Sequence, residues 1–241
     1  MSARRTLRRS AELLGAFRLE SSDPDFFYGL LARDAVAIMG EHASLAGSRV
    51  LDVGGGAGYF TKALREAGAK CVVVEQDIGE LSWRGAPPDG AVVADGCELP
   101  FADEVADLVV SSNVLEHAEL PYALCSDMIR TARRGGLIWI SFTNWFSPWG
   151  GHETSPWHLA GGQYALRRFT QRHGHPPKNR YGENLFAIHV GTTLAWVRAR
   201  RDVEILDSGP RYHPAFARGV VHVPGLREVA TWNLELLLRR R

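Results

Sequence analysis

The stretch from Val50 to Phe60 is the feature that most constrains the fold of this chain. An apolar run ends in Asp52, and a glycine then occupies every second position from 54 to 58 before residues with helical spacing begin. This pattern predicts a strand, a glycine turn and a helix, an arrangement on which nucleotides bind. Glycines adopt positive φ values and leave the backbone open to close approach. We therefore expect a ligand to lie against Gly54, Gly55 and Gly56.

The turn differs from the dinucleotide-binding fingerprint. That fingerprint needs a third glycine three positions after the second, and this position holds Tyr59. Asp52 at the strand end would repel a pyrophosphate, but it suits a cationic ligand that carries an amino acid. The pattern Asp52-x-Gly54-x-Gly56-x-Gly58 resembles the first motif of class I S-adenosylmethionine-dependent methyltransferases, and a nicotinamide dehydrogenase is the weaker alternative.

From about residue 48, apolar runs alternate with helix-spaced segments, which is typical of a parallel sheet with helices on both faces. The expected strands are 49–53, 70–75, 91–95, 106–112, 136–143 and 203–207. Helices are expected after Ser22-Asp23-Pro24, from Tyr59 to about Ala67, from Pro121 to just before Gly135-Gly136, and at about 192–200 and 224–230. The run 232–238 is ambiguous by periodicity.

The resemblance resolves this ambiguity and implies a fold class. It implies an α/β, Rossmann-like, doubly wound sheet of seven strands, six parallel and the seventh, at 232–238, antiparallel beside the sixth. We expect one methyltransferase domain over 1–241, which is long enough to bury a substantial core. Its parts are an N-terminal helical cover (1–46), a cofactor-binding core (47–143), an acceptor or lid insertion (144–190) and the C-terminal part of the sheet (191–241).

Candidate cofactor-binding residues follow successive strands, where open α/β sheets bind their ligands. Glu75, with Gln76 beside it, ends the second strand, where a carboxylate can accept hydrogen bonds from both ribose hydroxyls. By the resemblance, Asp95 accepts from the adenine amino group and the backbone at Gly96 and Cys97 adjoins the ring. The resemblance also places the segment that contains Asn113 under the methionine moiety. It therefore implies S-adenosyl-L-methionine as the cofactor.

The insertion should supply the chemistry, because long connections with little regular structure are uncommon unless they are functional. It leaves the fifth strand beside the reactive end of the cofactor, so we expect it to fold over the strand ends as a lid. The candidate bases are His117, His158 and the pair His152 and Glu153, since imidazole titrates near neutral pH. For each histidine, a packing role or a solvated loop position is the competing interpretation.

Aromatic and basic residues of the insertion predict a small acceptor that carries a ring or a negative charge. Trp145, Trp149 and Trp157 could stack on a ring. The basic residues are Arg167, Arg168, Arg172, Lys178 and Arg180. The segment around Gly151-His152-Glu153 and His175-Pro176-Pro177-Lys178-Asn179 also resembles unassigned actinobacterial methyltransferases. We favour methyl transfer to a hydroxyl oxygen of a small molecule; the alternative is a non-catalytic module that binds S-adenosylmethionine and holds a protein partner.

Net charge, cysteine spacing and the length of apolar stretches disfavour several other classes of protein. A formal charge of +1 gives no overall field toward nucleic acid or anionic membranes. Three cysteines without CxxC spacing disfavour a disulfide framework and a thiolate zinc site, and we expect no metal. No apolar stretch is long enough to span a bilayer and no signal peptide is evident, so we expect a cytoplasmic protein without stable membrane insertion. The basic ends, which are Arg4, Arg5, Arg8, Arg9 and 239–241, are expected to be solvated.

Overall fold

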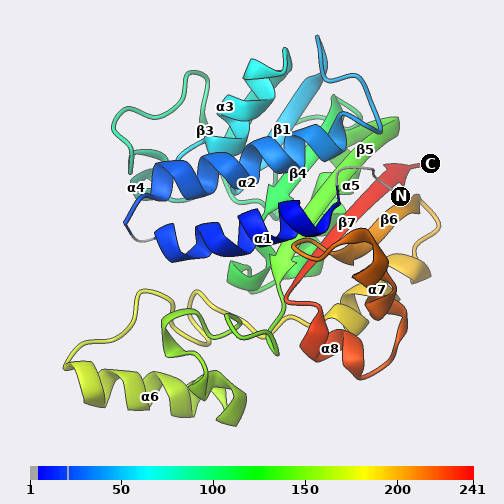
Figure 1. Ribbon diagram of the computed structural model, residues 1–241. Helices are drawn as coiled ribbons and strands as arrows, with labels where there is room; N and C mark the ends of the chain where they lie inside the picture. The colour runs from blue at the N-terminus through cyan, green and yellow to red at the C-terminus, as the bar shows by residue number, and fades with distance from the viewer. Residues whose placement is uncertain (1–4, 21) are drawn as a thin grey trace.

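The sheet forms the centre of the molecule. The computed structural model describes residues 5–20 and 22–241, and its seven strands pair in the order β3-β2-β1-β4-β5-β7-β6. Helices cover both faces of this sheet (Figure 1). The strands are β1 (Arg49–Val53), β2 (Lys70–Glu75), β3 (Val92–Val93), β4 (Ala106–Ser112), β5 (Ala132–Thr143), β6 (Val203–Pro210) and β7 (Asn233–Arg240).

The ambiguous run 232–238 is a strand, as the resemblance implied. β7 lies between β5 and β6 and pairs antiparallel with both of them, while the other neighbouring strands pair in parallel. Leu236 and Leu238 pack into the core on one face of the sheet and Leu237 into the core on the other. Both faces of β7 are therefore buried, so no polar side of the strand produces an alternating pattern.

The helices form two layers. α2 (Pro24–Met39) and α3 (Tyr59–Glu66) pack against one face, and α5 (Pro121–Thr131) and α7 (Val190–Ala199) pack against the other. α2 begins where the sequence predicted it, because the Asp23 side chain accepts a hydrogen bond from the Phe26 amide at 3.1 Å. The other helical segments outside residues 144–190 are α1 (Leu7–Ala16), η1 (Phe17–Leu19), α4 (Ile78–Leu81), η2 (Leu115–His117), η5 (Ala215–His222) and α8 (Leu226–Ala230).

Two predicted boundaries were wrong. α5 ends at Thr131, so 132–134 belong to β5 rather than to the helix. Ala132 pairs with Ala106, but the pairing resumes only at Leu137 opposite Leu108, and Gly135, at φ +74°, lies in this irregular stretch. The two glycines therefore form a bulge within a strand and not a helix stop. The third strand is also shorter than the predicted 91–95.

Residues 144–190 lie beyond the carboxyl ends of the parallel strands, and their helix α6 (Gly162–His173) projects from the body of the molecule (Figure 1). The insertion also contains the short helices η3 (His152–Thr154) and η4 (Trp157–Ala160). Backbone hydrogen bonds fix its two ends: the Trp145 amide donates to the Ile188 carbonyl at 3.0 Å within the insertion, and the Phe186 amide donates to the Glu116 carbonyl of η2 at 2.8 Å. Sequence analysis did not predict α6, which buries little beyond Gly162 and Ala165 and so shows a weak apolar stripe.

The expectation of solvated basic ends was wrong at two N-terminal arginines and at Arg240, which pairs with Glu104 at 3.4 Å and donates to the Arg130 carbonyl at 2.6 Å. Arg4 lies outside the described residues. Arg5 is 3% exposed and pairs with Glu235 of β7 and with Asp207 of β6. Arg9 pairs with Asp34 of α2 at 2.6 Å. The segment before α1 and α1 itself are thus tied to the sheet and to α2 by ion pairs with little access to water.

Replacing Arg5 should reveal how much this attachment stabilises the fold. Arg5→Ala leaves the buried Glu235 carboxylate with Arg218, at 3.9 Å, as its remaining cation among the described residues, so we expect the free energy of unfolding to fall by about 3 kcal/mol. Urea denaturation measures the change. Arg8→Ala, at a neighbouring exposed position, is the control and should change stability by less than about 0.5 kcal/mol. Equal effects of the two variants would contradict this account.

Candidate active site

The glycine turn between β1 and α3 has the predicted conformation. Gly54, Gly56 and Gly58 have φ values of +70°, +49° and +80°. A Cβ atom at Gly54 would lie 2.5 Å from the Val114 side chain, so a larger residue would clash there. At Gly56 a Cβ atom would meet nothing within 4 Å. The turn is therefore packed against the protein on one side and open on the other, as close approach by a ligand requires.

Asp52 lies under this turn. It is 1% exposed, and its Oδ2 accepts a hydrogen bond from the Thr61 hydroxyl of α3 at 2.7 Å. A Cβ atom at Gly55 would lie 2.6 Å from the same oxygen. Burial raises the pKa of Asp52 to about 6 despite the hydrogen bond from Thr61. This carboxyl group therefore links the strand end to α3 and shapes the turn from below.

Glu75 reaches the open side of the turn from the end of β2. Its Oε2 accepts a hydrogen bond from the Gly56 amide at 3.2 Å, and its Oε1 accepts one from the Gln76 amide at 2.9 Å. The Gln76 side chain is exposed. Oε1 also accepts a hydrogen bond from the Asp77 amide at 3.2 Å, so Oε2, which accepts only the Gly56 amide among the described residues, is the oxygen with more room for a ligand hydroxyl.

Asp95, Gly96 and Cys97 form a tight turn after β3. Asp95 Oδ1 accepts a hydrogen bond from the Cys97 amide at 2.8 Å. A Cβ atom at Gly96 would lie 3.0 Å from Leu124 of α5 and 3.2 Å from Val53 of β1. The close packing at Gly96 thus brings this turn against the end of β1, on the same edge of the sheet as Glu75.

Asn113 follows β4 with φ +57°, and its Oδ1 accepts a hydrogen bond from Asn233 Nδ2 at 2.7 Å. Next to it lies Arg211, which sequence analysis did not identify and which is completely buried. Arg211 donates at 3.0 Å to the hydroxyls of both Ser112 and Ser141, and at 3.2 Å to the Leu31 carbonyl. A buried cation therefore fixes the carboxyl ends of β4 and β5 to α2.

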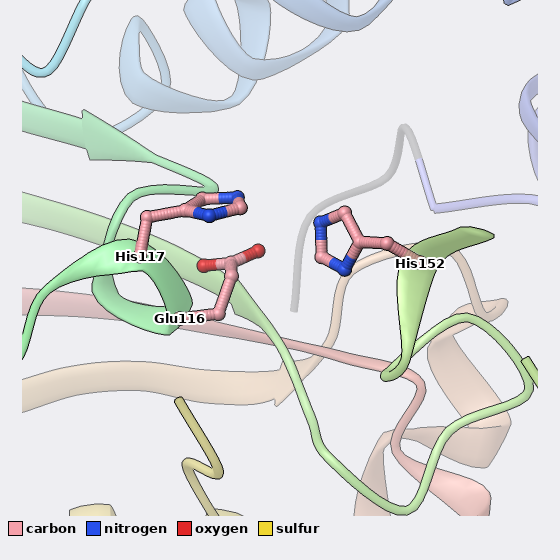
Figure 2. A group of neighbouring side chains, drawn as sticks. All are labelled: Glu116, His117 and His152. Atoms are coloured by element: carbon pink, nitrogen blue, oxygen red, sulfur yellow. The ribbon is translucent and has the colours of Figure 1, made fainter. Parts of the chain in front are cut away.

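The structure brings two of the predicted histidines together. His117 of η2 and His152 of η3 have ring centroids 5.0 Å apart, and the Glu116 carboxylate lies between the two rings (Figure 2). Burial, aided by the neighbouring His117, lowers the pKa of His152 to about 3, so its ring is neutral near pH 7. Glu116 was not predicted as a site residue. The sequence signal that could have identified it is a Glu-His pair shortly after a strand.

The other candidates of the insertion lie elsewhere. His158 is 1% exposed, and its Nε2 contacts the Trp145 carbonyl at 2.9 Å. Glu153 accepts two hydrogen bonds from Asn179 Nδ2, both of 3.1 Å. These contacts hold the insertion together, whereas the pair His117 and His152 faces the end of β4.

The three tryptophans also have partners within the protein. Trp145 is buried against His158, Trp149 stacks on Phe17, and Arg168 lies 3.9 Å above the centre of the Trp157 ring. Trp157 keeps 43% of its surface exposed. Trp145 is thus committed to packing, and Trp157 keeps the more accessible ring surface.

Comparison with known proteins identifies the class. Residues 51–140 match the family model described as a methyltransferase domain. A chain described as an S-adenosylmethionine dependent methyltransferase from Mesorhizobium loti has the same fold, with a TM-score of 0.57, 22% identity and coverage of 86% of this chain and 96% of that one. Magnesium protoporphyrin IX methyltransferase from Synechocystis PCC 6803, solved with bound SAH, gives a TM-score of 0.52 at 18% identity, covering 88% and 83% of the two chains.

Sequence relatives give the family. An "Uncharacterized methyltransferase" of Mycolicibacterium vanbaalenii is 47% identical, covering 99% of this chain and 96% of the relative. A protein of the same description from Mycolicibacterium gilvum is 46% identical, with coverage of 99% and 97%. The chain belongs to this actinobacterial family of class I S-adenosylmethionine-dependent methyltransferases. Within 5–20 and 22–241, no helix is long and apolar enough to cross a membrane.

The raised pKa of Asp52 predicts how stability depends on pH. An ordinary aspartate titrates near pH 3.9, so the folded state holds this proton more tightly than the unfolded state. The resulting stabilisation is present below about pH 4 and is lost as the pH rises through about 6. Asp52→Asn removes this titration. We therefore expect the unfolding free energy of the wild type, relative to the variant, to fall by about 3 kcal/mol between pH 4 and 7.

Denaturant unfolding at several pH values measures this difference. Asp89→Asn, at an exposed position, is the control, and its stability should stay parallel to that of the wild type. A pH-independent difference between Asp52→Asn and the wild type would show that Asp52 titrates normally.

Proposed function

We propose that this methyltransferase transfers a methyl group from S-adenosyl-L-methionine to a hydroxyl oxygen of a small-molecule acceptor. The observation that carries the proposal is the meeting of His117 and His152 beside Glu116, directly beyond the end of β4 (Figure 2). Groups that can take up or direct a proton are thereby concentrated at the edge of the sheet where α/β folds bind ligands.

The residues around the glycine turn fit the cofactor. Gly56 offers open backbone, and the Glu75 carboxylate beside it would accept hydrogen bonds from the ribose hydroxyls. The turn at Asp95, Gly96 and Cys97 would hold the adenine, and Asn113 would lie beneath the methionine part. The positions of these residues on one edge of the sheet support this assignment.

The chemistry needs little from the protein beyond placement. The sulfonium of the bound cofactor supplies a methyl group that is already activated. The protein must hold the acceptor oxygen in line with this methyl group at about 3–3.5 Å, which contributes roughly 7–11 kcal/mol. As the new oxygen–carbon bond forms and the carbon–sulfur bond breaks, the hydroxyl proton must leave to solvent, and the polar side chains of Glu116, His117 and His152 would surround the position from which it departs.

The insertion would enclose the acceptor. Lys178 pairs with Glu80 of α4 at 2.9 Å, so the segment 144–190 spans from the β4 end to the region after β2. Such a cover excludes water and selects the acceptor. The exposed ring surface of Trp157 and the basic residues of α6 favour an acceptor with a ring or a negative charge. A formal charge of +1 favours a small molecule over nucleic acid.

Cofactor binding is tested by isothermal titration calorimetry. We expect S-adenosylmethionine and S-adenosylhomocysteine to bind with a Kd on the order of micromolar and NAD not to bind. Glu75→Ala should weaken both by about 1.5–3 kcal/mol because charged hydrogen bonds to the ribose are lost. Glu66→Ala, on the exposed side of α3, is the control. An unchanged Kd in folded Glu75→Ala would remove Glu75 from the cofactor site.

The histidine pair is tested separately from cofactor binding. His152→Asn keeps a residue type that tolerates positive φ, and we expect turnover with an accepted substrate to fall about 100-fold or more while the cofactor Kd stays unchanged. His175→Asn, at an exposed position of the same insertion, is the control. Cofactor binding by the wild type without turnover of any hydroxyl-bearing acceptor would instead favour the non-catalytic module that holds a protein partner.

A further inference from the structure

Glu116, His117 and His152 form a compact cluster of potential metal ligands. One oxygen or nitrogen atom from each side chain lies within 4.8 Å of the others. Glu116 and His117 come from η2 after β4, and His152 comes from η3 in the insertion. Figure 2 shows the carboxylate of Glu116 directed into the space between the two imidazole rings.

Glu116 has one free acceptor in an environment with almost no water. The residue is 2% exposed, and its Oε1 accepts a hydrogen bond from the Thr143 amide at 2.9 Å. Its Oε2 is buried and has no hydrogen-bond partner among the described residues. A buried carboxylate oxygen without a partner is costly, and a bound cation would compensate it.

His117 is held in the form that a metal requires. Its Nδ1 lies 2.7 Å from the Asn184 carbonyl, which can only accept, so Nδ1 carries a proton and Nε2 is the nitrogen that offers a lone pair in the neutral ring. A backbone carbonyl that accepts from the outer nitrogen of a ligating histidine is the usual second contact of such residues.

His152 is directed toward the cluster by an uncommon backbone conformation. Its φ is +48°, and the turn is fixed by hydrogen bonds from its amide to Trp149 at 2.9 Å and from the Ser155 amide to its carbonyl at 3.0 Å. Its Nδ1 is buried and has no hydrogen-bond partner among the described residues. A left-handed conformation at a residue other than glycine costs free energy and is concentrated at functional sites.

We propose that Glu116, His117 and His152 bind a divalent transition-metal ion, for which Zn²⁺ is the natural probe. Two imidazoles and one carboxylate are a donor set typical of catalytic zinc and non-haem iron sites, which keep positions open for a water or substrate oxygen. No metal was expected from the sequence, because the cysteine spacing offers no site and these three ligands come from two separate segments.

The donor atoms are close enough to bind one ion after small movements of their side chains. Zinc bonds of about 2.0–2.2 Å place neighbouring donors about 3.3–3.5 Å apart, so no pair of donors must approach by more than about 1.5 Å. Rotation of the His152 and Glu116 side chains covers such a distance, while His117 stays fixed by Asn184.

The role of the ion rests on the proposed function. An acceptor hydroxyl bound at an open position would have a lower pKa and lose its proton to water. The resulting oxygen forms a bond to the methyl carbon, the carbon–sulfur bond breaks, and the electron pair returns to sulfur.

Metal binding is tested on the whole protein after treatment with a chelator and without any acceptor, so that its outcome is independent of the methyl-transfer proposal. We expect calorimetric titration with ZnCl₂ to show one equivalent bound, and Co²⁺ to give the visible absorption of a site with nitrogen and oxygen ligands. Glu116→Gln and His152→Asn should each weaken Zn²⁺ binding at least tenfold; loss of even an indirect contact costs about 10–100-fold.

Control variants distinguish this site from non-specific binding of Zn²⁺ by other histidines. Glu116→Gln keeps an oxygen that can accept from the Thr143 amide, and circular dichroism verifies that both variants fold. His173→Asn with His175→Asn removes a pair of rings 6.2 Å apart on the insertion and should leave Zn²⁺ binding unchanged. Absence of stoichiometric binding by the wild type, or equal affinity of folded Glu116→Gln, His152→Asn and the wild type, would overturn the proposal.

Discussion

The parallel pairing of β1 with β2 and β4 is the constraint on which the site depends. Because Val53 lies opposite Val74 and Asp52 opposite Val110, the three strands end at one edge. The glycine turn, Glu75 and Asn113 all leave the sheet at this edge, and each is held there by backbone contacts that a slipped register would break. A shift of one strand by one residue would also exchange the two faces of that strand, so the apolar residues that fill the core also specify where the glycine turn, Glu75 and Asn113 lie.

The sequence predicted this part of the molecule well because its determinants are local. A glycine turn, an acid at a strand end and a helix start such as Asp23-Pro24 each depend on a few consecutive residues. The fold class followed from alternating segments and from the resemblance, which also resolved β7, whose burial on both faces hides its periodicity. The boundary between α5 and β5 was missed because Gly135-Gly136 suits a helix stop and a bulge equally, and the pairing with β4 decides between them.

The remaining features depend on contacts between distant segments. Arg211 looks like any surface arginine in the sequence, and its burial follows only from the approach of α2, β4 and β5. The association of Glu116 with His152 requires the insertion to return to η2, where the Phe186 amide bonds to the Glu116 carbonyl. Likewise, the role of Arg5 is determined by carboxylates on β6 and β7, more than 200 positions away. No pattern of neighbouring residues indicates which distant segments of the chain come into contact.

The position of β7 has a consequence for how the chain acquires its structure. β6 precedes β7 in the sequence, yet β7 lies between β5 and β6 in the sheet. β7 forms hydrogen bonds with β5 on one side and with β6 on the other. While the chain is being made, β6 therefore has no strand to pair with until residues 233–240 have left the ribosome. Until then β5 presents an open edge, and Arg5 lacks Glu235. The part of the sheet that contains β1 to β5 can form before β7 is available, but the sheet becomes continuous only when β7 enters between β5 and β6.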